Sequence, residues 1–282
     1  MEPHNIINVG KRIPKIVSNI GNNTWGVKCG LKDLDDALLG FHGGELIVLA
    51  GRPSSGKTSC SIGMALGTSK YVKTLYFSLE VSANVVQERM LCQEAEINYY
   101  DILKNGVGDN KSKLEEAAET ISKRKLFIDD TPNLNTEDFE KIIEEEKVEC
   151  AFVDYVQLIS SGNWSENRVR EIDVICRNLR AVAKQHNIPV ILLAQLNRQV
   201  EQRPKHRPLL CDLKDSGSLE QLAQVVLLLH RPSLYESRDL GREVEDTLDA
   251  EIIIAKAYNG PTGVVRVGFM DYAMKFVSLS DF

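Results

Sequence analysis

The sequence of 282 residues lacks the runs and clusters that mark several classes of protein. It has no stretch of about 18 apolar residues, and its polar start does not resemble a secretory signal, so we expect a cytoplasmic protein with no membrane partner. The six cysteines include no C-x-x-C pair and no Cys/His cluster, which argues against a zinc site and for reduced, mostly buried thiols. The formal charge is −6, so binding of nucleic acid would need a local basic patch.

The chain also lacks internal repeats and low-complexity linkers, so we expect one α/β domain over residues 26–282 after an arm at residues 1–25. Apolar stripes predict helices over Thr136–Lys147 and Glu166–Asn187. Apolar runs predict nine strands: Leu46–Ala50, Thr74–Ser78, Leu126–Asp129, Cys150–Asp154, Val190–Ala194, Val225–Leu229, Glu251–Ala255, Val264–Phe269 and Lys275–Leu279. The first six read as central strands covered on both faces, and the last three have no helix between them. This pattern predicts a mostly parallel, twisted sheet flanked by helices and completed by a C-terminal β-meander.

Residues Gly51–Thr58 read G-x-x-x-x-G-K-T directly after the first apolar run, and a helix is expected from Ser59 to Leu66. This is the pattern of a phosphate-binding loop. Glycines let successive N–H groups surround a phosphate, the helix N-terminus adds partial positive charge, and Lys57 neutralises the β- and γ-phosphates. The Thr58 hydroxyl can ligate Mg²⁺. The sequence therefore predicts a site for a nucleoside triphosphate, taken as ATP, with Mg²⁺, formed by Gly51, Ser54, Ser55, Gly56, Lys57, Thr58 and Ser59.

Two acidic residues at predicted strand ends can complete the chemistry of hydrolysis. Asp154 ends an apolar strand, the form of a Walker B acid, and can hold Mg²⁺ through a water. Glu80 follows a different strand, where a carboxylate can act as the base that polarises the attacking water. Gln195 follows a third strand, where its amide can either sense the γ-phosphate or cap a neighbouring element. Either carboxylate, taken alone, can also be a solvated loop acid.

Several blocks of the sequence resemble the ATPase domain of DnaB-type replicative helicases, in family order from about residue 25 to the C-terminus. They are Gly30–Asp35, Gly40–Phe41, Gly43–Leu46, Ala50–Pro53, Tyr76–Glu80, Phe152–Ile159, Ala194–Arg198, Asp212–Gln221 and Asn259–Gly263. The resemblance implies a RecA-like fold and a ring hexamer with ATP sites between subunits. It also implies 5′→3′ translocation along single-stranded DNA, with primase or a helicase loader as further partners.

The resemblance also implies roles for single residues at the nucleotide. Lys57 and Thr58 match the phosphate-loop pair, and Glu80 matches the catalytic glutamate. Asp154 matches the Walker B acid, and Gln195 matches the γ-phosphate sensor. Arg89 matches an arginine that lies near the nucleotide in the family, although an exposed helix arginine is an equal interpretation.

A DNA-binding role is implied for a second set of residues. Lys214, Asp215 and Gly217 match a loop that holds DNA phosphates in the central channel. Between Asn197 and Lys214 the sequence has a local excess of positive charge, which includes Arg198, Arg203 and Arg207. Such charges can add phosphate contacts without base specificity, and a solvated charge run is the alternative interpretation.

The chain departs from the family pattern at the arginine finger. Family members have Lys-x-Arg before Asn-Gly-Pro, and the arginine reaches into the neighbouring subunit's site. Here the triplet is Lys256-Ala257-Tyr258. A tyrosine carries no charge at neutral pH, and loss of such a finger can lower the rate by about 10³ or more. Either Lys256 substitutes as a catalytic cation, or another arginine (Arg242 or Arg266) does, or hydrolysis is weak.

The N-terminal arm stands where the family has a helical domain and a linker that docks on the adjacent subunit. The sequence is therefore expected to be either a short natural protein or an excised fragment. Pro14 interrupts the apolar segment Ile6–Ile20 and Gly10 weakens it, so we expect at most a short helix there.

Three functions agree with these patterns. The first is an ATP-driven replicative DNA helicase or its motor domain, which the blocks at Leu213–Gln221 and Asn259–Gly263 favour. The second is a RecA-like ATPase of recombinase or signalling type that does not unwind DNA. The third is an interaction protein that binds ATP and DNA but hydrolyses ATP weakly, which Tyr258 keeps open.

Overall fold

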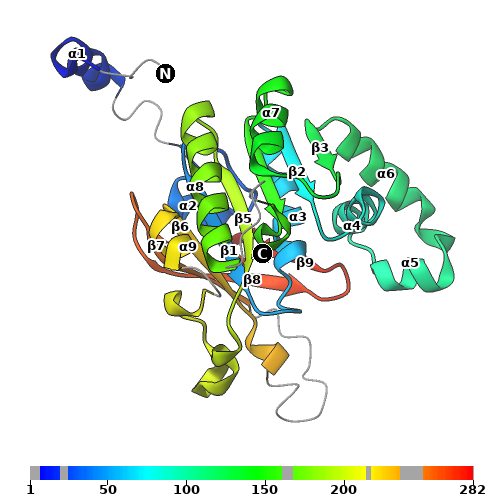
Figure 1. Ribbon diagram of the computed structural model, residues 1–282. Coiled ribbons are helices and arrows are strands. Elements are labelled where there is room, and N and C mark those ends of the chain that lie inside the picture. The colour runs from blue at the N-terminus through cyan, green and yellow to red at the C-terminus, as the bar shows by residue number, and fades with distance from the viewer. Residues whose placement is uncertain (1–6, 20–24, 161–167, 214–216, 236–249, 282) are drawn as a thin grey trace.

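The structure is a computed structural model that describes residues 7–19, 25–160, 168–213, 217–235 and 250–281 (Figure 1). Its centre is a nine-stranded sheet in the order β3-β2-β4-β5-β1-β6-β7-β8-β9. The strands are β1 Leu46–Gly51, β2 Thr74–Ser78, β3 Leu126–Asp129, β4 Cys150–Asp154, β5 Val190–Gln195, β6 Val225–His230, β7 Ala250–Ala257, β8 Gly263–Met270 and β9 Lys275–Ser278. The first six are parallel to their neighbours, and β6 to β9 are joined antiparallel. The predicted parallel sheet with a terminal meander is thus confirmed.

The helices cover both faces of this sheet (Figure 1). They are α1 Val9–Asn19, α2 Lys32–Leu38, α3 Lys57–Thr68, α4 Ala83–Ala95, α5 Tyr99–Asn105, α6 Lys111–Ser122, α7 Thr136–Glu145, α8 Arg168–His186 and α9 Gly217–Leu222. On one face α8 contacts β1 and β5, with α7 and α9 packed beside it. On the other face α3 contacts β1, β2, β4 and β5, and α4 packs on α3. Among the described residues, no helix is long and apolar enough to span a bilayer.

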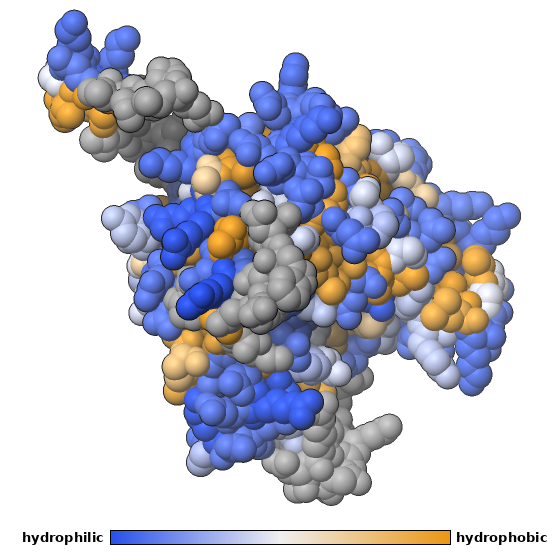
Figure 2. Space-filling view, viewed as in Figure 1, coloured by the Kyte–Doolittle hydropathy of each residue, from blue (hydrophilic) through white to orange (hydrophobic). Residues whose placement is uncertain are grey.

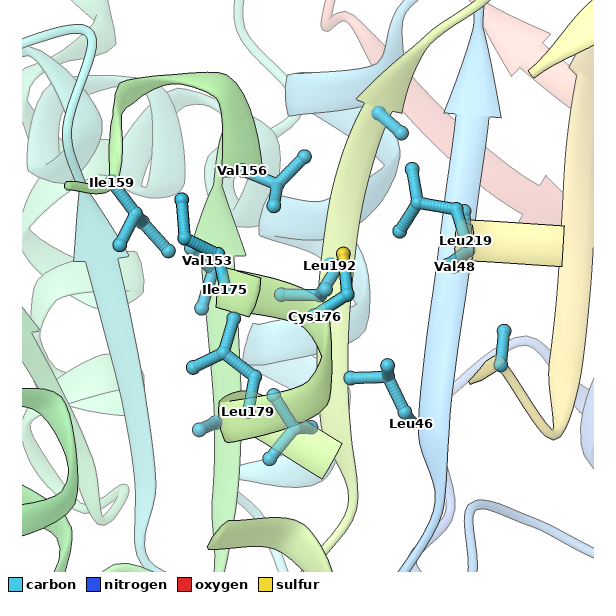
Figure 3. Close-up of a cluster of buried hydrophobic side chains, with 14 of the residues drawn as sticks. Leu46, Val48, Val153, Val156, Ile159, Ile175, Cys176, Leu179, Leu192 and Leu219 are labelled. Carbon is cyan, nitrogen blue, oxygen red and sulfur yellow. The ribbon is translucent and has the colours of Figure 1, made fainter. Parts of the chain in front are cut away.

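The central strand β1 supplies both layers of the core because its side chains alternate between the faces. Leu46 and Val48 belong to the cluster beneath α8, which also holds Ile175, Leu179 and Leu192 (Figure 3). Ile47 and Leu49 belong to the cluster beneath α3. All six residues of β1 are buried, as expected of a strand with a neighbour on each side and helices on both faces. The phosphate loop therefore follows a fully buried central strand of the sheet.

Five of the six cysteines are buried and unpaired, and Cys211 is exposed and unpaired. Burial raises the pKa of the Cys60 thiol to about 12. A thiol with so high a pKa is a poor nucleophile and metal ligand, because both functions need the thiolate. The expectation of reduced, mostly buried cysteines is confirmed.

One strand prediction is wrong in its placement. Leu126–Asp129 was expected among the central strands, but β3 lies at the edge of the sheet and pairs only with β2. Phe127 is 47% exposed, and the Lys73 ammonium lies 4.6 Å from the centre of its ring. A short apolar run reads the same at an edge as in the middle, so the sequence pattern alone does not separate the two.

The expectation that Pro14 interrupts the arm is also wrong. Helix α1 runs for 11 residues with Pro14 inside it. Proline at this position removes one main-chain hydrogen bond, to the carbonyl of Gly10. Val9, Ile13, Ile16 and Val17 recur at helical spacing and are all exposed, which forms the orange patch at the upper left of Figure 2. The arm is thus an amphipathic helix whose apolar face meets no core residue of its own chain among those described.

Candidate nucleotide site and basic segment

The carboxyl ends of β1, β2, β4 and β5 lie at one edge of the sheet, because these strands are parallel and adjacent. A cavity of about 600 Å³ opens at this edge. It is lined by Pro53, Ser54, Gly56, Lys57, Thr58, Ser59, Glu80, Asp154, Tyr155, Gln195, Arg231, Phe269, Asp271 and Met274. The predicted phosphate loop, both predicted acids and the predicted sensor amide therefore meet in one cavity.

The loop between β1 and α3 has the geometry of an anion cradle. Gly56 has φ 91° at the N-cap of α3, a conformation that favours glycine. A Cβ at Gly51 would lie 2.4 Å from Ser55 Oγ, so the loop closes tightly on its first residue. Ser55 Oγ is buried and has no hydrogen-bond partner among the described residues. A buried hydroxyl left unpaired beside a helix N-terminus suits a phosphate oxygen as its missing partner.

Lys57 and Asp154 are held in the cavity as buried charges of opposite sign. Burial lowers the pKa of the Lys57 ammonium, while the Asp154 and Glu80 carboxylates act in the opposite direction. Burial raises the pKa of the Asp154 carboxyl, while hydrogen bonds from Thr58 and Tyr76 oppose that rise. Lys57 Nζ donates to the Arg52 carbonyl at 3.2 Å. A site with one desolvated cation and one desolvated carboxylate suits a ligand that brings both an anion and a divalent cation.

Tyr76 fixes the Asp154 carboxylate and was missed from the sequence. Its Oη donates to Asp154 Oδ2 at 3.0 Å and lies 2.9 Å from Ser61 Oγ of α3. Asp154 is 3% exposed. The hydrogen bond therefore gives a buried carboxylate oxygen a partner and links β4 through β2 to the phosphate-loop helix.

Glu80 and Gln195 occupy the ends of the strands on either side of β4. Glu80 follows β2, is exposed and lines the cavity, and the Leu79 N–H donates to the Asp154 carbonyl at 2.9 Å. Gln195 ends β5 opposite Gly51 of β1 and also lines the cavity. An exposed carboxylate at the cavity wall can accept a proton from water, and an amide there can bond a phosphate oxygen.

The far wall of the cavity comes from residues that the sequence analysis did not single out. Arg231, which directly follows β6, places its Cζ 3.7 Å from the centre of the Phe269 ring. Its Nη2 donates to Asp271 Oδ1 at 2.6 Å, and burial lowers the pKa of its guanidinium group. Met274 completes this wall. The position of Arg231 at a strand end, as for Asp154 and Gln195, is the signal that points to it.

Arg89 lies on α4, half-buried, and is not among the residues that line the cavity. Its Nε is buried with no hydrogen-bond partner among the described residues. Its charge acts on Tyr76, where it opposes the rise that burial causes in the pKa of the phenol. The Arg89 charge thus lies within electrostatic range of Tyr76, and its role at the nucleotide remains a prediction.

Lys256 and Tyr258 lie away from the cavity of their own chain. Lys256 Nζ donates to the carbonyls of Glu220 at 2.6 Å and Gln221 at 3.3 Å, at the C-terminal end of α9. A cation there also interacts favourably with the helix dipole. Tyr258 is 77% exposed. A part for either side chain in hydrolysis therefore requires the site of another subunit. Of the alternative arginines, Arg266 is exposed on β8, and Arg242 lies outside the described residues.

The basic segment, residues 196–213 after β5, folds into short 3₁₀ turns: η3 Arg198–Gln202, η4 Pro204–His206 and η5 Leu210–Asp212. Arg198 is exposed. Arg203 bonds both oxygens of the buried Asp212 carboxylate, and Arg207 pairs with Glu251 of β7. These two predicted DNA-binding arginines therefore have carboxylate partners that the sequence pattern did not indicate. Lys214 and Asp215 lie outside the described residues, and Gly217 begins α9.

A phosphate loop after a central parallel strand, with acids at the ends of two nearby strands, defines a P-loop NTPase. The fold is RecA-like, since the structure superimposes on the ATPase domain of G40P with a TM-score of 0.90 and 28% identity over 98% of this chain and 100% of that one. The family model of the DnaB-like helicase C-terminal domain matches residues 26–278, and the chain belongs to this family.

Curated relatives agree with this assignment. The chain is 37% identical over 94% of its length to the replicative DNA helicase DnaB of Geobacillus stearothermophilus, of which it covers 59%. It is 36% identical over 97% of its length to the DnaB of Rickettsia typhi, of which it covers 61%. A DnaB-like replicative helicase, whose structure was described with its interactions with primase, matches with a TM-score of 0.87 and 28% identity. That match covers 99% of this chain and 68% of the helicase. The chain thus spans about 60% of the length of these curated relatives.

Proposed function

We propose that this chain is the ATPase motor of a replicative DNA helicase, which hydrolyses ATP with Mg²⁺ and moves 5′→3′ along single-stranded DNA as a ring hexamer. The observation that carries the proposal is the meeting of Lys57, Glu80 and Asp154 in one cavity of a chain from the DnaB-like family. In the same proposal, the chain acts in the cytoplasm at a replication fork, where primase or a helicase loader is its partner.

The residues of the cavity divide the work of hydrolysis among them. The main-chain N–H groups of Ser54–Thr58, the Ser55 hydroxyl and the Lys57 ammonium hold the phosphates of the nucleotide. Thr58 and Asp154 would hold Mg²⁺, Asp154 through a water, and the bound ion would neutralise charge that develops on the phosphates. Glu80 accepts a proton from the water that attacks the γ-phosphate, and Gln195 hydrogen-bonds that phosphate. Residues at the ends of four parallel strands thus act on the γ-phosphate, its metal ion and the attacking water.

Assembly into a ring completes the site in this proposal. Each subunit presents Lys256 and Tyr258 to the site of its neighbour. The exposed apolar face of α1 supports association, because such a face is unfavourable in water and suits a surface of another subunit. Single-stranded DNA then passes the basic segment, where Arg198 offers an exposed charge, together with Lys214, Asp215 and Gly217.

Weak hydrolysis is the second candidate, and Tyr258 is the observation that favours it. An exposed neutral side chain stands at the finger position, and Lys256 is already bonded to two carbonyls of α9. A chain of this kind would bind ATP and DNA as an interaction protein, or act as a RecA-like ATPase without unwinding.

A DNA-stimulated ATPase assay, run beside strand displacement on a forked substrate, separates these functions. A helicase motor shows ATPase activity that DNA stimulates and displaces the strand of a fork with a free 5′ tail. Stimulated hydrolysis without displacement indicates the non-unwinding ATPase. Binding of both ligands with no stimulated hydrolysis indicates the interaction protein.

A further inference from the structure

A buried arginine connects the phosphate loop to the basic segment, and it has no role in the hydrolytic mechanism described above. Arg52 is the second residue of the loop, and its side chain is only 8% exposed. Its Nη1 donates to the Leu196 carbonyl at 2.7 Å. Its Nε and Nη2 lie 2.9 Å and 2.8 Å from Glu201 Oε1. These three side-chain contacts all reach the segment that follows β5.

The basic segment is held together by contacts between its own two ends. Leu196 forms an isolated antiparallel bridge with Leu213, and the Asn197 N–H donates to the Asp212 carbonyl at 2.7 Å. The bidentate Arg203–Asp212 pair closes the same loop through side chains. Residues 196–213 therefore form one internally bonded unit, which the Arg207–Glu251 pair also ties to β7. Arg198 lies on this unit, and the chain continues from it into Lys214–Ser216, outside the described residues.

The other end of the linkage lies at the phosphates. Lys57 Nζ donates to the Arg52 carbonyl. The lysine assigned to the nucleotide phosphates is thus hydrogen-bonded to the main chain of the arginine that contacts the basic segment. Gly51 also pairs with Gln195 in the β1–β5 register, and the Leu196 N–H donates to the Gly51 carbonyl at 3.2 Å. The Arg52–Glu201 pair extends this β1–β5 contact beyond the ends of the strands.

We propose that the Arg52–Glu201 ion pair couples nucleotide binding to DNA binding, with Glu201 as a positioning residue that touches neither ligand. This inference rests on the proposed function, in which residues 196–213 contact DNA. A shift of Lys57 toward a bound phosphate moves the Arg52 peptide, and the guanidinium group passes that displacement to Glu201 and Leu196. By thermodynamic linkage, DNA bound to the segment then changes nucleotide affinity by the factor by which nucleotide changes DNA affinity.

The test is a coupling factor measured for the parent chain and for Glu201→Gln. The dissociation constant of single-stranded DNA is measured with and without a non-hydrolysable ATP analogue, and that of the analogue with and without DNA. Glutamine keeps an acceptor for Arg52 but removes the charge. We expect the coupling factor and the DNA stimulation of ATP hydrolysis to fall about fivefold or more, within the usual range of such couplings. Glu201→Asp, which keeps the charge, restores part of both.

A matched control and a fold check accompany the test. Glu146→Gln removes a carboxylate that accepts from Lys73 at 2.9 Å, at the amino end of β2 and far from the phosphate loop, so its coupling factor stays at the parent value. Thermal melts and sedimentation confirm that the variants fold and assemble like the parent. Because the coupling factor is a ratio, a general weakening of both ligands cancels and does not imitate the expected result.

The outcomes separate the inference from the proposed function. A parent chain with a coupling factor above one and a Glu201→Gln variant with the same factor overturns the inference and leaves the motor intact. A parent chain whose nucleotide and DNA affinities are independent overturns the proposed function and the inference with it. Loss of the coupling factor in Glu201→Gln and its partial return in Glu201→Asp support both.

Discussion

Lys57 and Glu80 act at different stages of the proposed reaction, although they line the same cavity. Lys57 contacts phosphate charge that is already present in the bound ground state, whereas Glu80 acts on the water only as the reaction proceeds. Lys57→Ala is therefore expected to abolish nucleotide binding. Glu80→Gln is expected to keep the affinity for ATP and to lower turnover by about 10²-fold or more. Equilibrium binding of a fluorescent nucleotide and steady-state ATPase rates measure the two effects, and parent-like turnover in Glu80→Gln would make Glu80 a solvated loop acid.

The buried Asp154 carboxylate is costly for the nucleotide-free protein. Burial raises its pKa in the folded state, so its contribution to stability is present below its ordinary pKa of about 4 and is lost as the pH rises through the folded value. At neutral pH the ionised group therefore destabilises the fold. Asp154→Asn is expected to raise the melting temperature of the nucleotide-free chain at pH 7.5, by about 2–4 °C for each kcal/mol recovered, while removing hydrolysis.

The sign of that effect is checked by repeating the melts in acid. The gain in melting temperature of Asp154→Asn over the parent should shrink as the pH falls and the parent carboxyl becomes protonated. A variant less stable than the parent at pH 7.5 would mean that the hydrogen bond from Tyr76 outweighs the desolvation of the charge.

At the scale of elements, Gln93 joins two walls of the nucleotide cavity from outside it. It lies on α4 with 2% of its surface exposed. Its Nε2 donates to the Ser59 carbonyl of α3 at 3.0 Å and to the Met274 carbonyl between β8 and β9 at 2.9 Å. Met274 lines the cavity, so this amide sets the distance between the phosphate-loop helix and the far wall.

Gln93→Leu removes both donors and leaves two carbonyls without their partner. We expect a loss of about 1–3 kcal/mol in the free energy of unfolding and a higher KM for ATP. Urea unfolding and steady-state kinetics measure these effects. Gln87→Leu, an exposed glutamine on the same helix, serves as the control and should change neither quantity. Equal stabilities for the two variants would show that water replaces the lost donors.

The elements predicted from the sequence are those whose signals are local. A pattern contained within about 20 residues predicts each of these elements: the phosphate loop, the apolar runs of β1 to β6 and the apolar stripe of α8. The contacts that were missed join distant parts of the chain: Tyr76 to Asp154 over 78 positions, Arg52 to Glu201 over 149, and Arg231 to Asp271 over 40. No pattern in a single sequence reports which carboxylate a given arginine will meet after folding. For that reason the strand ends of the site were predicted, but the far wall and the supporting pairs were not.

At the scale of the whole molecule, hydrolysis in the proposed ring depends on what a neighbouring subunit supplies. Lys256 offers one positive charge, but an ammonium group lacks the planar fork with which arginine holds two phosphate oxygens. We expect slow basal turnover whose specific rate rises with protein concentration as rings assemble. Tyr258→Arg is expected to raise turnover, because it restores the finger that the family pattern has at this position.

Lys256→Ala provides the companion measurement. It should nearly eliminate turnover with little change in nucleotide affinity, since Lys256 does not line the cavity of its own chain. Tyr71→Arg, which adds the same charge at another exposed tyrosine, controls for a nonspecific effect of charge. The measurement is the ATPase rate of the parent, of both variants and of the control across a series of protein concentrations. A fast, concentration-independent parent rate that ignores both substitutions would place the finger elsewhere.

The order of the strands also dictates how the domain is made. During synthesis β1 emerges early, but its neighbour β5 lies about half the chain later, and β6 follows β5. Pairing at such separation makes for a high contact order and slow folding, whereas the antiparallel β7–β9 hairpins join residues close in sequence and can form quickly. A chain halted before residue 190 would hold β1 with neither neighbour, its apolar residues open to chaperones and to aggregation. The phosphate loop, encoded near the start of the chain, is therefore among the last parts of the domain to reach its working geometry.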